Sequence, residues 1–374
     1  MSLKVLIAPD KFKGTLTAHA AAEAIARGWG KARPADQLDL LPISDGGDGF
    51  GEILCGLLGA RPQRLKTVDA AERPLTSTWW WEPKSRMAII ESARIVGLAL
   101  LPPWKFHPFQ LDTRGLAAAF TAAARKGARR CIVGIGGSAT NDGGFGVARA
   151  LGWQFLNQHD EAIETWTALH SLASIRAPKT RLFREVLVAV DVQNRLLGAR
   201  GCSRIYGPQK GLRPEDFPAS EKCLRRLAAV ARRQFNRDFA TEPGSGAAGG
   251  LGFGLCAFAG ARLVPGFDLL ARHAQLEQHL RATDLVITGE GALDKSTLMG
   301  KGVGELASRC KKRKLPCVGL GGRVDDRAQL RRLFATARGL TEITTSEKAQ
   351  AQAARYLEQL AELTAREYRC DSKK

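Results

Sequence analysis

The sequence predicts an α/β protein, because strand-like and helix-like segments alternate near both ends of the chain. Lys4 to Ala8 is a short apolar run typical of a buried strand, and an alanine-rich stretch, Ala18 to about Gly30, follows with Thr17 as its N-cap. The same alternation returns at Asp284 and continues toward the end of the chain. Both ends are therefore expected to build one domain with a parallel sheet.

The middle of the chain has a different pattern. Arg64 to Val68, Leu75 to Trp81 and Met87 to Glu91 are predicted strands joined by turns without a helix, which favours antiparallel pairing. We therefore expect residues 64–283 to form a mixed α/β domain inserted into a discontinuous domain of residues 1–63 and 284–374.

The remaining elements follow from the same apolar periodicities and end signals. Predicted strands are Leu38 to Ile43, the run from Cys131, Glu185 to Val190, Asp284 to Thr288 and Cys317 to Leu320. Predicted helices are Phe50 to Leu58 (ended by Gly59), Gly115 to Lys126, Phe145 to Leu151, Ser220 to Phe235, a helix opened by Pro243 to Gly250, Asp268 to Arg281, Lys301 to Lys312, Asp326 to Ala337 and Ser346 to Tyr368.

Composition restricts the class of protein. The chain has 374 residues, a formal net charge of +19 and a pI near 10, but its basic residues are scattered along the sequence without interleaved aromatic residues. We expect a general field that favours anionic ligands and no nucleic-acid partner. The eight cysteines stand singly, without metal-ligand spacing, and no signal peptide or membrane span is predicted, so a cytoplasmic protein is expected.

Glycine-rich loops follow several predicted strands. The run from Cys131 passes into Gly134-Ile135-Gly136-Gly137-Ser138-Ala139-Thr140-Asn141-Asp142 before the helix at Phe145. Glycine lets backbone amides approach a bound group, and a helix N-terminus favours an anion. The strands ending before Asp45 and Glu290 also run into glycine and acid. Since ligands bind outside the carboxyl ends of parallel strands, these loops predict a phosphate site.

Two stretches partly match the dinucleotide fingerprint. Gly244-x-Gly246-x-x-Gly249 has no strand before it, and Gly134-x-Gly136-x-x-Ala139 has a strand but no acidic residue at the required distance. A nicotinamide-dependent hydroxy-acid oxidoreductase therefore remains an alternative, as does a non-enzymatic basic protein that binds nucleic acid.

The polar residues in these loops suit phosphoryl transfer from a magnesium nucleotide. Carboxylates bind Mg²⁺ through oxygen, lysines neutralise phosphate charge, and one carboxylate orients the acceptor hydroxyl. The chain supplies these groups beside its glycine loops at Asp10, Lys13, Asp45, Asp48, Asn141, Asp142, Asp191, Asn194, Lys210, Glu290, Asp294 and Lys301.

The chain resembles the bacterial glycerate kinase family of the glyoxylate and glucarate pathways. The resemblance runs nearly end to end and rests on ordered motifs: Ile7-Ala8-Pro9-Asp10-x-Phe12-Lys13-Gly14, Asp45-Gly46-Gly47-x-Gly49, Gly134 to Gly144, Asp191-Val192-x-Asn194, Gly207-Pro208-Gln209-Lys210-Gly211, Gly244-x-Gly246-Ala247-Ala248-Gly249-Gly250 and Ile287-Thr288-Gly289-Glu290-Gly291. It implies ATP- and Mg²⁺-dependent phosphorylation of D-glycerate, usually at the 2-hydroxyl to give 2-phosphoglycerate. It also implies a discontinuous flavodoxin-like domain, an inserted mixed α/β domain and an active site in the cleft between them.

Roles are assigned on this basis. Asp191 is expected to receive the hydroxyl proton and Lys210 to contact phosphate, while Asp294 or Asp45 binds the metal. Nucleotide phosphates are expected at Gly134, Gly136, Gly137, Ser138, Thr140, Gly246 and Gly249, and glycerate at Asp10, Lys13, Arg114 and Asn194. The sequence leaves open the 2- or 3-phosphate product, and a monomer or a homodimer.

Overall fold

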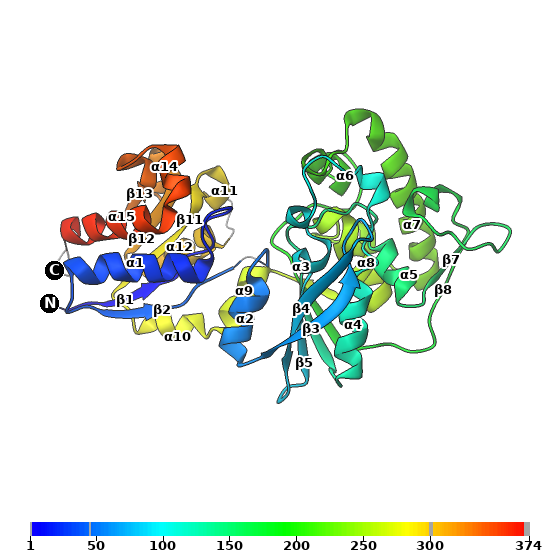
Figure 1. Cartoon of the computed structure of the whole chain (residues 1–374), viewed down its shortest axis with the longest axis horizontal. Coiled ribbons are helices and arrows are strands. Elements are labelled where there is room, and N and C mark those ends of the chain that lie inside the picture. Colours follow the sequence, from blue (N-terminus) through cyan, green and yellow to red (C-terminus); the bar gives the residue numbers. More distant parts are fainter. Residues whose placement is uncertain (1, 45, 299–301, 370–374) are drawn as a thin grey trace. The chain divides into compact units, whose positions relative to one another are not determined.

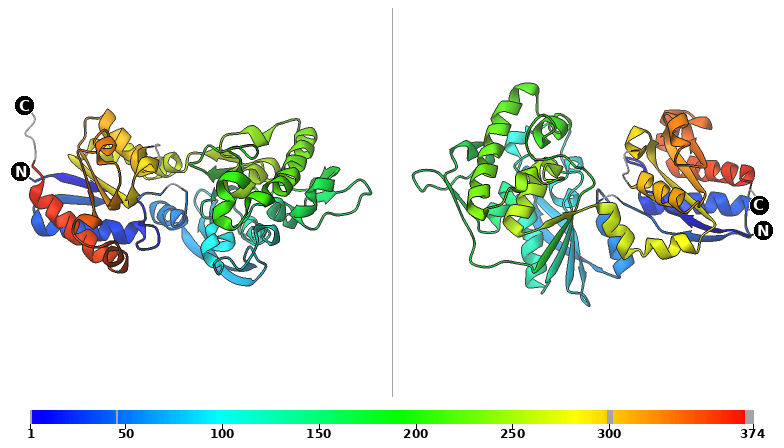
Figure 2. Two further views of the ribbon diagram at one scale, coloured as in Figure 1. Left: turned by 90° about the horizontal axis from the view of Figure 1, so that it is seen from above. Right: turned by 180° about the vertical axis from the view of Figure 1, so that it is seen from behind.

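The computed structural model describes residues 2–44, 46–298 and 302–369. Contacts divide the chain into two compact units, one formed by Met1–Asp45 with Phe267–Lys374 and the other by Gly46–Gly266. The first unit therefore uses both ends of the chain, and the second is continuous (Figures 1 and 2). The helix that follows Gly49 packs on strands of the second unit and belongs to it.

The first unit contains a five-stranded sheet in the order β13-β12-β11-β1-β2, with every neighbouring pair parallel. Numbered within the unit, this order is 2-1-3-4-5, the order of flavodoxin-like doubly wound sheets. Helices α1 and α15 pack against each other on one face, and α12 lies on the other (Figure 2). The strands and helices of this unit are β1 (Lys4–Ile7), α1 (Ala18–Ala32), β2 (Gln37–Leu40), α9 (Gly266–His273), α10 (Leu276–Arg281), β11 (Leu285–Leu293), α11 (Lys295–Leu298), α12 (Val303–Lys312), β12 (Cys317–Val324), α13 (Arg327–Leu330), β13 (Thr336–Gly339), α14 (Ser346–Ala351) and α15 (Ala353–Glu367).

The second unit is built on a six-stranded mixed sheet in the order β10-β9-β6-β5-β4-β3. The pairs β3/β4 and β4/β5 are antiparallel, whereas β5, β6, β9 and β10 are parallel. Strands β7 and β8 form a separate two-stranded antiparallel sheet. The strands and helices of this unit are α2 (Phe50–Leu58), β3 (Arg61–Val68), β4 (Pro74–Glu82), β5 (Met87–Glu91), α3 (Ala93–Val96), α4 (Leu116–Arg125), β6 (Arg130–Gly134), α5 (Phe145–Ala150), β7 (Gln154–Leu156), β8 (Ser174–Arg176), β9 (Glu185–Ala189), α6 (Cys202–Tyr206), α7 (Phe217–Phe235), α8 (Ala247–Ala259) and β10 (Arg262–Val264).

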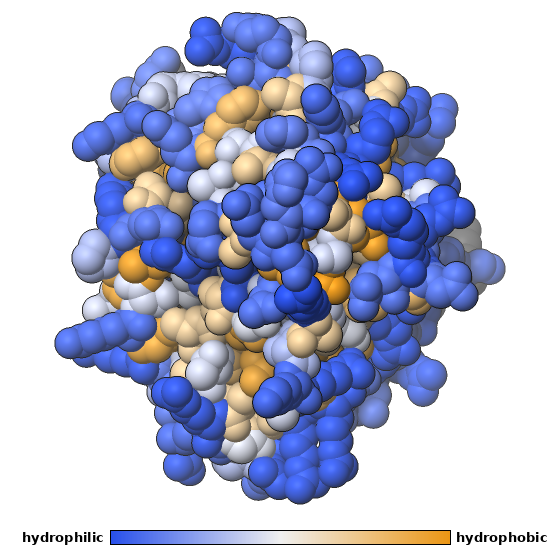
Figure 3. All heavy atoms as spheres, turned by 90° about the vertical axis from the view of Figure 1, so that its right-hand side faces the viewer, coloured by the Kyte–Doolittle hydropathy of each residue, from blue (hydrophilic) through white to orange (hydrophobic). Residues whose placement is uncertain are grey.

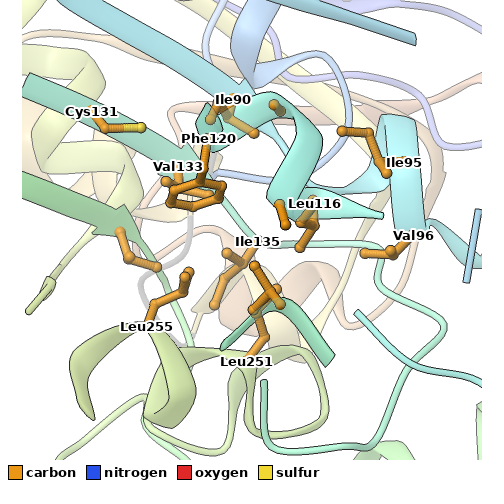
Figure 4. Close-up of a cluster of buried hydrophobic side chains, with 14 of the residues drawn as sticks. Ile90, Ile95, Val96, Leu116, Phe120, Cys131, Val133, Ile135, Leu251 and Leu255 are labelled. Carbon is orange, nitrogen blue, oxygen red and sulfur yellow. The ribbon is translucent and has the colours of Figure 1, made fainter. Parts of the chain in front are cut away.

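The core of the second unit lies on one face of this sheet. Alternate residues of β5 and β6, such as Ile90 and Val133, meet Phe120 of α4 and Leu251 of α8 (Figure 4). Each of these side chains is no more than 1% exposed. This packing fixes the carboxyl end of β6, where the first glycine-rich loop begins. It also fixes α8, into which the glycine-rich stretch after Gly244 leads.

The face of the second unit seen in Figure 3 is mostly hydrophilic with scattered apolar residues. In the described part of the chain, no helix combines the length and apolar character needed to cross a membrane.

Several predicted elements match the structure closely. Thr17 caps α1 by accepting a hydrogen bond from the backbone N–H of Ala20 (3.1 Å), and Gly59 ends α2 in a left-handed conformation. The predicted strand Met87 to Glu91 is β5, and its antiparallel pairing with β4 is confirmed.

Other predictions about elements were wrong. The single helix expected over Asp268 to Arg281 is two helices, α9 and α10, separated at Gln275 with φ +50°. The helix expected over Asp326 to Ala337 ends at Leu330, and the chain then forms an unpredicted edge strand, β13. The stretch that was expected to open α8 contains three consecutive left-handed residues, Ala248, Gly249 and Gly250, and is therefore a turn.

Candidate active site

The glycine-rich loop after β6 is held in place by backbone hydrogen bonds on both sides. The N–H of Ala139 donates to the carbonyl of Val96 (2.8 Å), and the carbonyl of Gly137 accepts from the N–H of Leu98 (2.8 Å). The N–H of Gly136 donates to the carbonyl of Gly46 (3.3 Å). The loop is thus fixed against the segment after β5 before any ligand binds.

Two amide groups at the tip of this loop are left for a ligand. Gly137 is exposed and has φ +76°, and Ser138 follows it. Within the described ranges, no acceptor hydrogen-bonds to the N–H of either residue. Successive backbone amides around a left-handed residue form a concavity that binds anions. The predicted phosphate loop therefore has two adjacent donors available at its tip.

The loop after Gly244 contacts the loop after β6 directly. The N–H of Gly143 donates to the carbonyl of Gly249 (3.0 Å), and a Cβ on Gly249 would lie 1.9 Å from the carbonyl oxygen of Thr140. The N–H of Gly246 donates to the carbonyl of Asn194 (2.9 Å). The structure thus brings together three segments that the sequence assigned to one site.

Lys210 lies under these loops at the end of a short 3₁₀ helix, Pro208–Lys210. Its side chain is buried, and its Nζ donates to the carbonyl oxygen of Thr140 (2.6 Å). Burial lowers the pKa of Lys210 to about 8, although the nearby Cys202 and Asp142 oppose that shift. A cation kept next to the loop at this cost suits an anionic ligand.

Asp142 organises the far end of the loop. This fully buried carboxylate accepts hydrogen bonds from the backbone N–H groups of Thr113 (3.0 Å), Gly144 (3.1 Å) and Gly146 (2.9 Å), and from the Thr113 hydroxyl (2.7 Å). Burial raises its pKa, and burial together with the charge of Asp142 raises the pKa of neighbouring Asp112 to about 6. Asp142 therefore braces the start of α5 rather than facing solvent.

Sequence reasoning missed some of these supports. Glu91 at the end of β5 accepts from the backbone N–H groups of Gly49 (2.9 Å) and Gly51 (3.0 Å), and so caps α2. Thr113 and Asp112 also went unassigned, because they follow no predicted strand. Asn141 was noted only as a loop amide; its Nδ2 donates to the hydroxyls of Ser203 (3.0 Å) and Ser220 (2.8 Å). Such partners, 62 and 79 residues away, leave no local signal in the sequence.

The other predicted residues of the second unit take varied positions. Asp191 follows β9, and its Oδ1 accepts from the N–H of Gly266 (2.9 Å). The side chain of Asn194 braces its own loop, since it donates to the carbonyl of Arg200 (2.8 Å) and accepts from the Tyr206 hydroxyl (2.6 Å). Arg114 precedes α4 and forms an ion pair with Glu72 (3.0 Å).

Within the first unit, the loop after β1 lies beside the second half of β11, where the loop predicted from Gly289 was wrong because the strand continues to Leu293. The N–H of Asp10 donates to the carbonyl of Gly289 (2.8 Å), and a Cβ on Gly291 would lie 3.2 Å from the backbone nitrogen of Lys13. The sheet order changes direction between β1 and β11, and such a switch point is where α/β sheets bind ligands. Asp10 and Lys13 therefore occupy a position suited to binding.

Asp294 lies just beyond this switch point. Its N–H donates to the hydroxyl of Thr297 (3.2 Å), which in turn donates to the carboxylate of Glu290 (2.7 Å). Asp45 and Lys301 lie outside the described residues. In the ranges that the structure describes, no group of three or more His, Cys, Asp and Glu side chains could hold a metal ion.

The fingerprint Gly134-x-Gly136-x-x-Ala139 does not open a helix. In a dinucleotide fold the fingerprint glycines lead directly into the helix, but here α5 begins only at Phe145. The geometry thus favours a phosphate loop over a nicotinamide site.

Comparisons with known proteins agree with this geometry. Residues 5–369 match the model of the Glycerate kinase family. The chain is 37% identical over 326 residues to the glycerate kinase of Bacillus subtilis, covering 86% of this chain and 85% of that protein. It is 36% identical over 330 residues to the glycerate 2-kinase of Escherichia coli, covering 87% of this chain and 86% of that one. A crystal structure from Salmonella typhimurium LT2, provisionally described as glycerate kinase 2, aligns with a TM-score of 0.82 at 32% identity and 98% coverage of both chains.

Proposed function

Since the chain belongs to the glycerate kinase family and is a phosphotransferase, we propose that it transfers the γ-phosphate of ATP to D-glycerate and forms 2-phosphoglycerate. The choice of the 2-hydroxyl follows the relative named glycerate 2-kinase, which is 36% identical. Phosphoryl transfer depends mainly on positioning the reacting groups and stabilising the negative charge of the phosphates. The loops described above can provide both.

The observation that carries this proposal is the pair of amides at Gly137 and Ser138. They lie at the tip of a loop fixed from both sides, and the buried cation of Lys210 contacts the same loop at the carbonyl of Thr140. We assign the nucleotide phosphates to this tip, with Gly134, Gly136, Thr140, Gly246 and Gly249 shaping the backbone around it. Preorganised donors stabilise developing negative charge without reorganising during the reaction.

Asp191 is the residue proposed to receive the proton of the acceptor hydroxyl. Its carboxylate follows β9, and a backbone N–H fixes one of its oxygens. A carboxylate held in this way can orient the hydroxyl and accept its proton as the phosphoryl group transfers. Lys210 would balance the charge of the phosphates.

The carboxylate of glycerate is assigned to Lys13 and Arg114, the substrate hydroxyls are assigned to Asp10, and Asn194 is assigned to the substrate site as a residue that shapes its loop. Arginine pairs with a carboxylate through two parallel hydrogen bonds, and Arg114 would exchange its present partner, Glu72, for the substrate. In this proposal Asn194 acts through its loop, since both ends of its amide already have partners.

Magnesium is proposed to enter with ATP. Mg²⁺ keeps several waters and binds proteins through one or two carboxylates plus substrate phosphates. Asp294 and Asp45 are the proposed carboxylates, and the ion would neutralise phosphate charge there.

A coupled assay for ADP release tests this function. D-Glycerate should support ADP formation that requires Mg²⁺, and phosphorus NMR of the product should show the 2-phosphate. Asp191→Asn should lower kcat by about 10²-fold or more, as expected for the loss of a general base. Asp238→Asn, a change at the half-exposed N-cap of the 3₁₀ helix Phe239–Thr241, serves as a control. Normal turnover of a folded Asp191→Asn enzyme would refute the role of Asp191, and a 3-phosphate product would correct the acceptor position.

A further inference from the structure

The proposed kinase site uses few of the cations behind the net charge of +19. The fold gathers a group of them at one edge of the six-stranded sheet. We call this group the arginine ledge; it consists of Arg86, Arg129, Arg130, Arg181, Arg184 and Arg262. These residues are scattered over 177 positions of sequence, so only the fold brings them together.

The topology of the sheet explains the ledge. Strands β5, β6, β9 and β10 are neighbours and parallel, so all four begin at the same edge. The N–H of Arg129 donates to the carbonyl of Arg86 (2.8 Å), and the N–H of Arg184 donates to the carbonyl of Arg129 (2.8 Å). Three arginines therefore stand side by side on successive strands, about 5 Å apart.

The outer part of the ledge continues this row. Arg262 begins β10, and Arg181 donates to the carbonyl of Gly260 (3.1 Å) just before it. Four strands place these cations along a line of roughly 14 Å. The ledge is thus a row of charges rather than a single point.

Carboxylates offset only part of the charge. Glu185 pairs with Arg130 (2.8 Å) and Arg262 (3.7 Å), whereas no salt bridge joins Arg86, Arg129 or Arg184 to an acid in the described ranges. The like charges of Arg86 and Arg184 lower the pKa of the exposed Arg129. Lys84, Arg125 and Lys126 add further cations at the same end of the sheet.

The ledge is separate from the proposed nucleotide site. The phosphate loop follows the carboxyl end of β6 at Gly134, whereas the ledge lies at its amino end at Arg130. A strand of this length separates the two by roughly 13 Å. The ledge and the phosphate loop therefore lie at opposite ends of β6.

The sequence predicts no nucleic-acid partner because its basic residues are scattered, but the fold brings these arginines together. We propose that the arginine ledge binds the phosphate backbone of double-stranded nucleic acid without reading its sequence. Guanidinium groups pair with phosphates through two hydrogen bonds, and a row of them can follow a backbone. Single strands bind mainly by stacking bases on exposed rings, but the aromatic residues at this edge, Trp81 and Phe183, pack against the core. Insertion into a lipid surface needs exposed apolar area, and within the described segments of the ledge Leu182 alone exposes a large apolar side chain.

Fluorescence anisotropy with a labelled duplex of random sequence tests the ledge on the full chain. If about five phosphates are contacted, the logarithm of the binding constant should fall with a slope of about −4.5 against the logarithm of salt concentration. Between 50 and 200 mM salt this slope corresponds to ~500-fold weaker binding. The triple change Arg86→Gln, Arg129→Gln and Arg184→Gln should make the slope shallower by roughly 2 to 3.

A matched control removes the same charge elsewhere. Arg225→Gln, Arg232→Gln and Arg233→Gln, all on α7, should leave the slope within about one unit of the unmodified chain. Arg86→Lys, Arg129→Lys and Arg184→Lys should retain most of the binding, because the charges remain. If the triple glutamine change prevents folding, Arg184→Gln alone should still reduce the slope by about one. Turnover should not change in any folded variant of the ledge.

Three results would overturn the proposal: no duplex binding at 50 mM salt, equal slopes for the ledge and α7 triples, or tighter binding to single strands than to duplexes. Binding to inorganic polyphosphate or to vesicles containing phosphatidylserine, without binding to duplex, would assign the ledge to a different polyanion and refute the choice of nucleic acid.

Discussion

Lys210 combines two properties that oppose each other in a folded protein. The residue is only 5% exposed, and its ammonium group donates to a neutral carbonyl, so burial disfavours its charge. The nearby Asp142 offsets part of that cost. A neutral side chain would pack here with less penalty, so the charge is best explained by an anion that binds above it.

Replacing Lys210 with methionine should separate stability from activity. Because the pKa of Lys210 is about 8 in the folded protein, below its ordinary value of 10.5, the folded state releases this proton before the unfolded state does. The wild type should therefore gain about 1–3 kcal/mol of unfolding free energy relative to Lys210→Met as pH rises from about 7.5 to 10.5. Urea denaturation at several pH values measures this difference, and a constant difference would contradict it.

The same variant should lose activity at neutral pH. If Lys210 balances phosphate charge, Lys210→Met should lower kcat/KM for ATP by about 10²-fold or more while the chain stays folded. Steady-state kinetics with D-glycerate at saturation measure the change. Lys210→Arg, which keeps the charge in a bulkier group, provides the comparison, and an unaltered kcat/KM in Lys210→Met would remove the residue from the site.

Asp142 illustrates a different case, a buried carboxylate that accepts several hydrogen bonds from protein groups. Asp142→Asn would place amide hydrogens against donors that now point at the carboxylate, so we expect a loss of about 2–4 kcal/mol of unfolding free energy. Chemical denaturation measures this loss. Glu164→Gln, at an exposed carboxylate, should cost less than about 1 kcal/mol. An Asp142→Asn protein as stable as the wild type would show that the network is not needed.

At the scale of elements, the contact between the two glycine loops sets the shape of the site. Gly249→Ala would combine a left-handed φ of +68° with a Cβ 1.9 Å from the Thr140 carbonyl oxygen, so the loops must separate. We expect a loss of about 3 kcal/mol or more and a large drop in kcat. Gly59→Ala has a similar φ of +62° in open space and should cost only about 1 kcal/mol with normal kcat. Equal effects of the two changes on kcat would contradict the role of the contact.

Elements with a local signal were predicted well from sequence. Thr17 and Gly59 mark helix ends by their own chemistry, and both ends match the structure. The break at Gln275 had no such marker, since neither glycine nor proline stands there. Strand β13 was missed because its residues Thr336, Ala337 and Arg338 have no apolar alternation and form a strand only through pairing with β12.

The candidate site was predictable to the same extent. The glycine loops could be recognised in the sequence by their composition. The structure shows that the loops after Gly134 and Gly244 are in contact. The residues that hold these loops in place could not be recognised, because Glu91, Thr113 and Ser203 act through partners distant in sequence. Sequence thus located the segments that approach a ligand, whereas the fold was needed to find the residues that hold them.

At the scale of the whole molecule, the first unit depends on both ends of the chain. Helix α1 comes from the N-terminal part and α15 from the C-terminal part, and they pack side by side on the same sheet (Figure 1). Their closest approach is at Gly28, where a Cβ would lie 2.0 Å from the backbone oxygen of Glu358. Arg27 and Lys31 also pair with the Glu358 side chain.

This arrangement predicts opposite effects for two neighbouring glycines of α1. Gly28→Ala should push α15 away from α1 and cost about 2–4 kcal/mol, because the atom it meets is rigid backbone. Gly30→Ala, whose nearest neighbour is a Leu38 methyl at 3.9 Å, should gain about 0.5–1 kcal/mol from higher helix propensity. Thermal denaturation of both variants measures these shifts. A stabilised Gly28→Ala protein would mean that the two ends of the chain do not pack as closely as the structure indicates, so the N-terminal strand and the C-terminal helix would no longer be expected to form one unit.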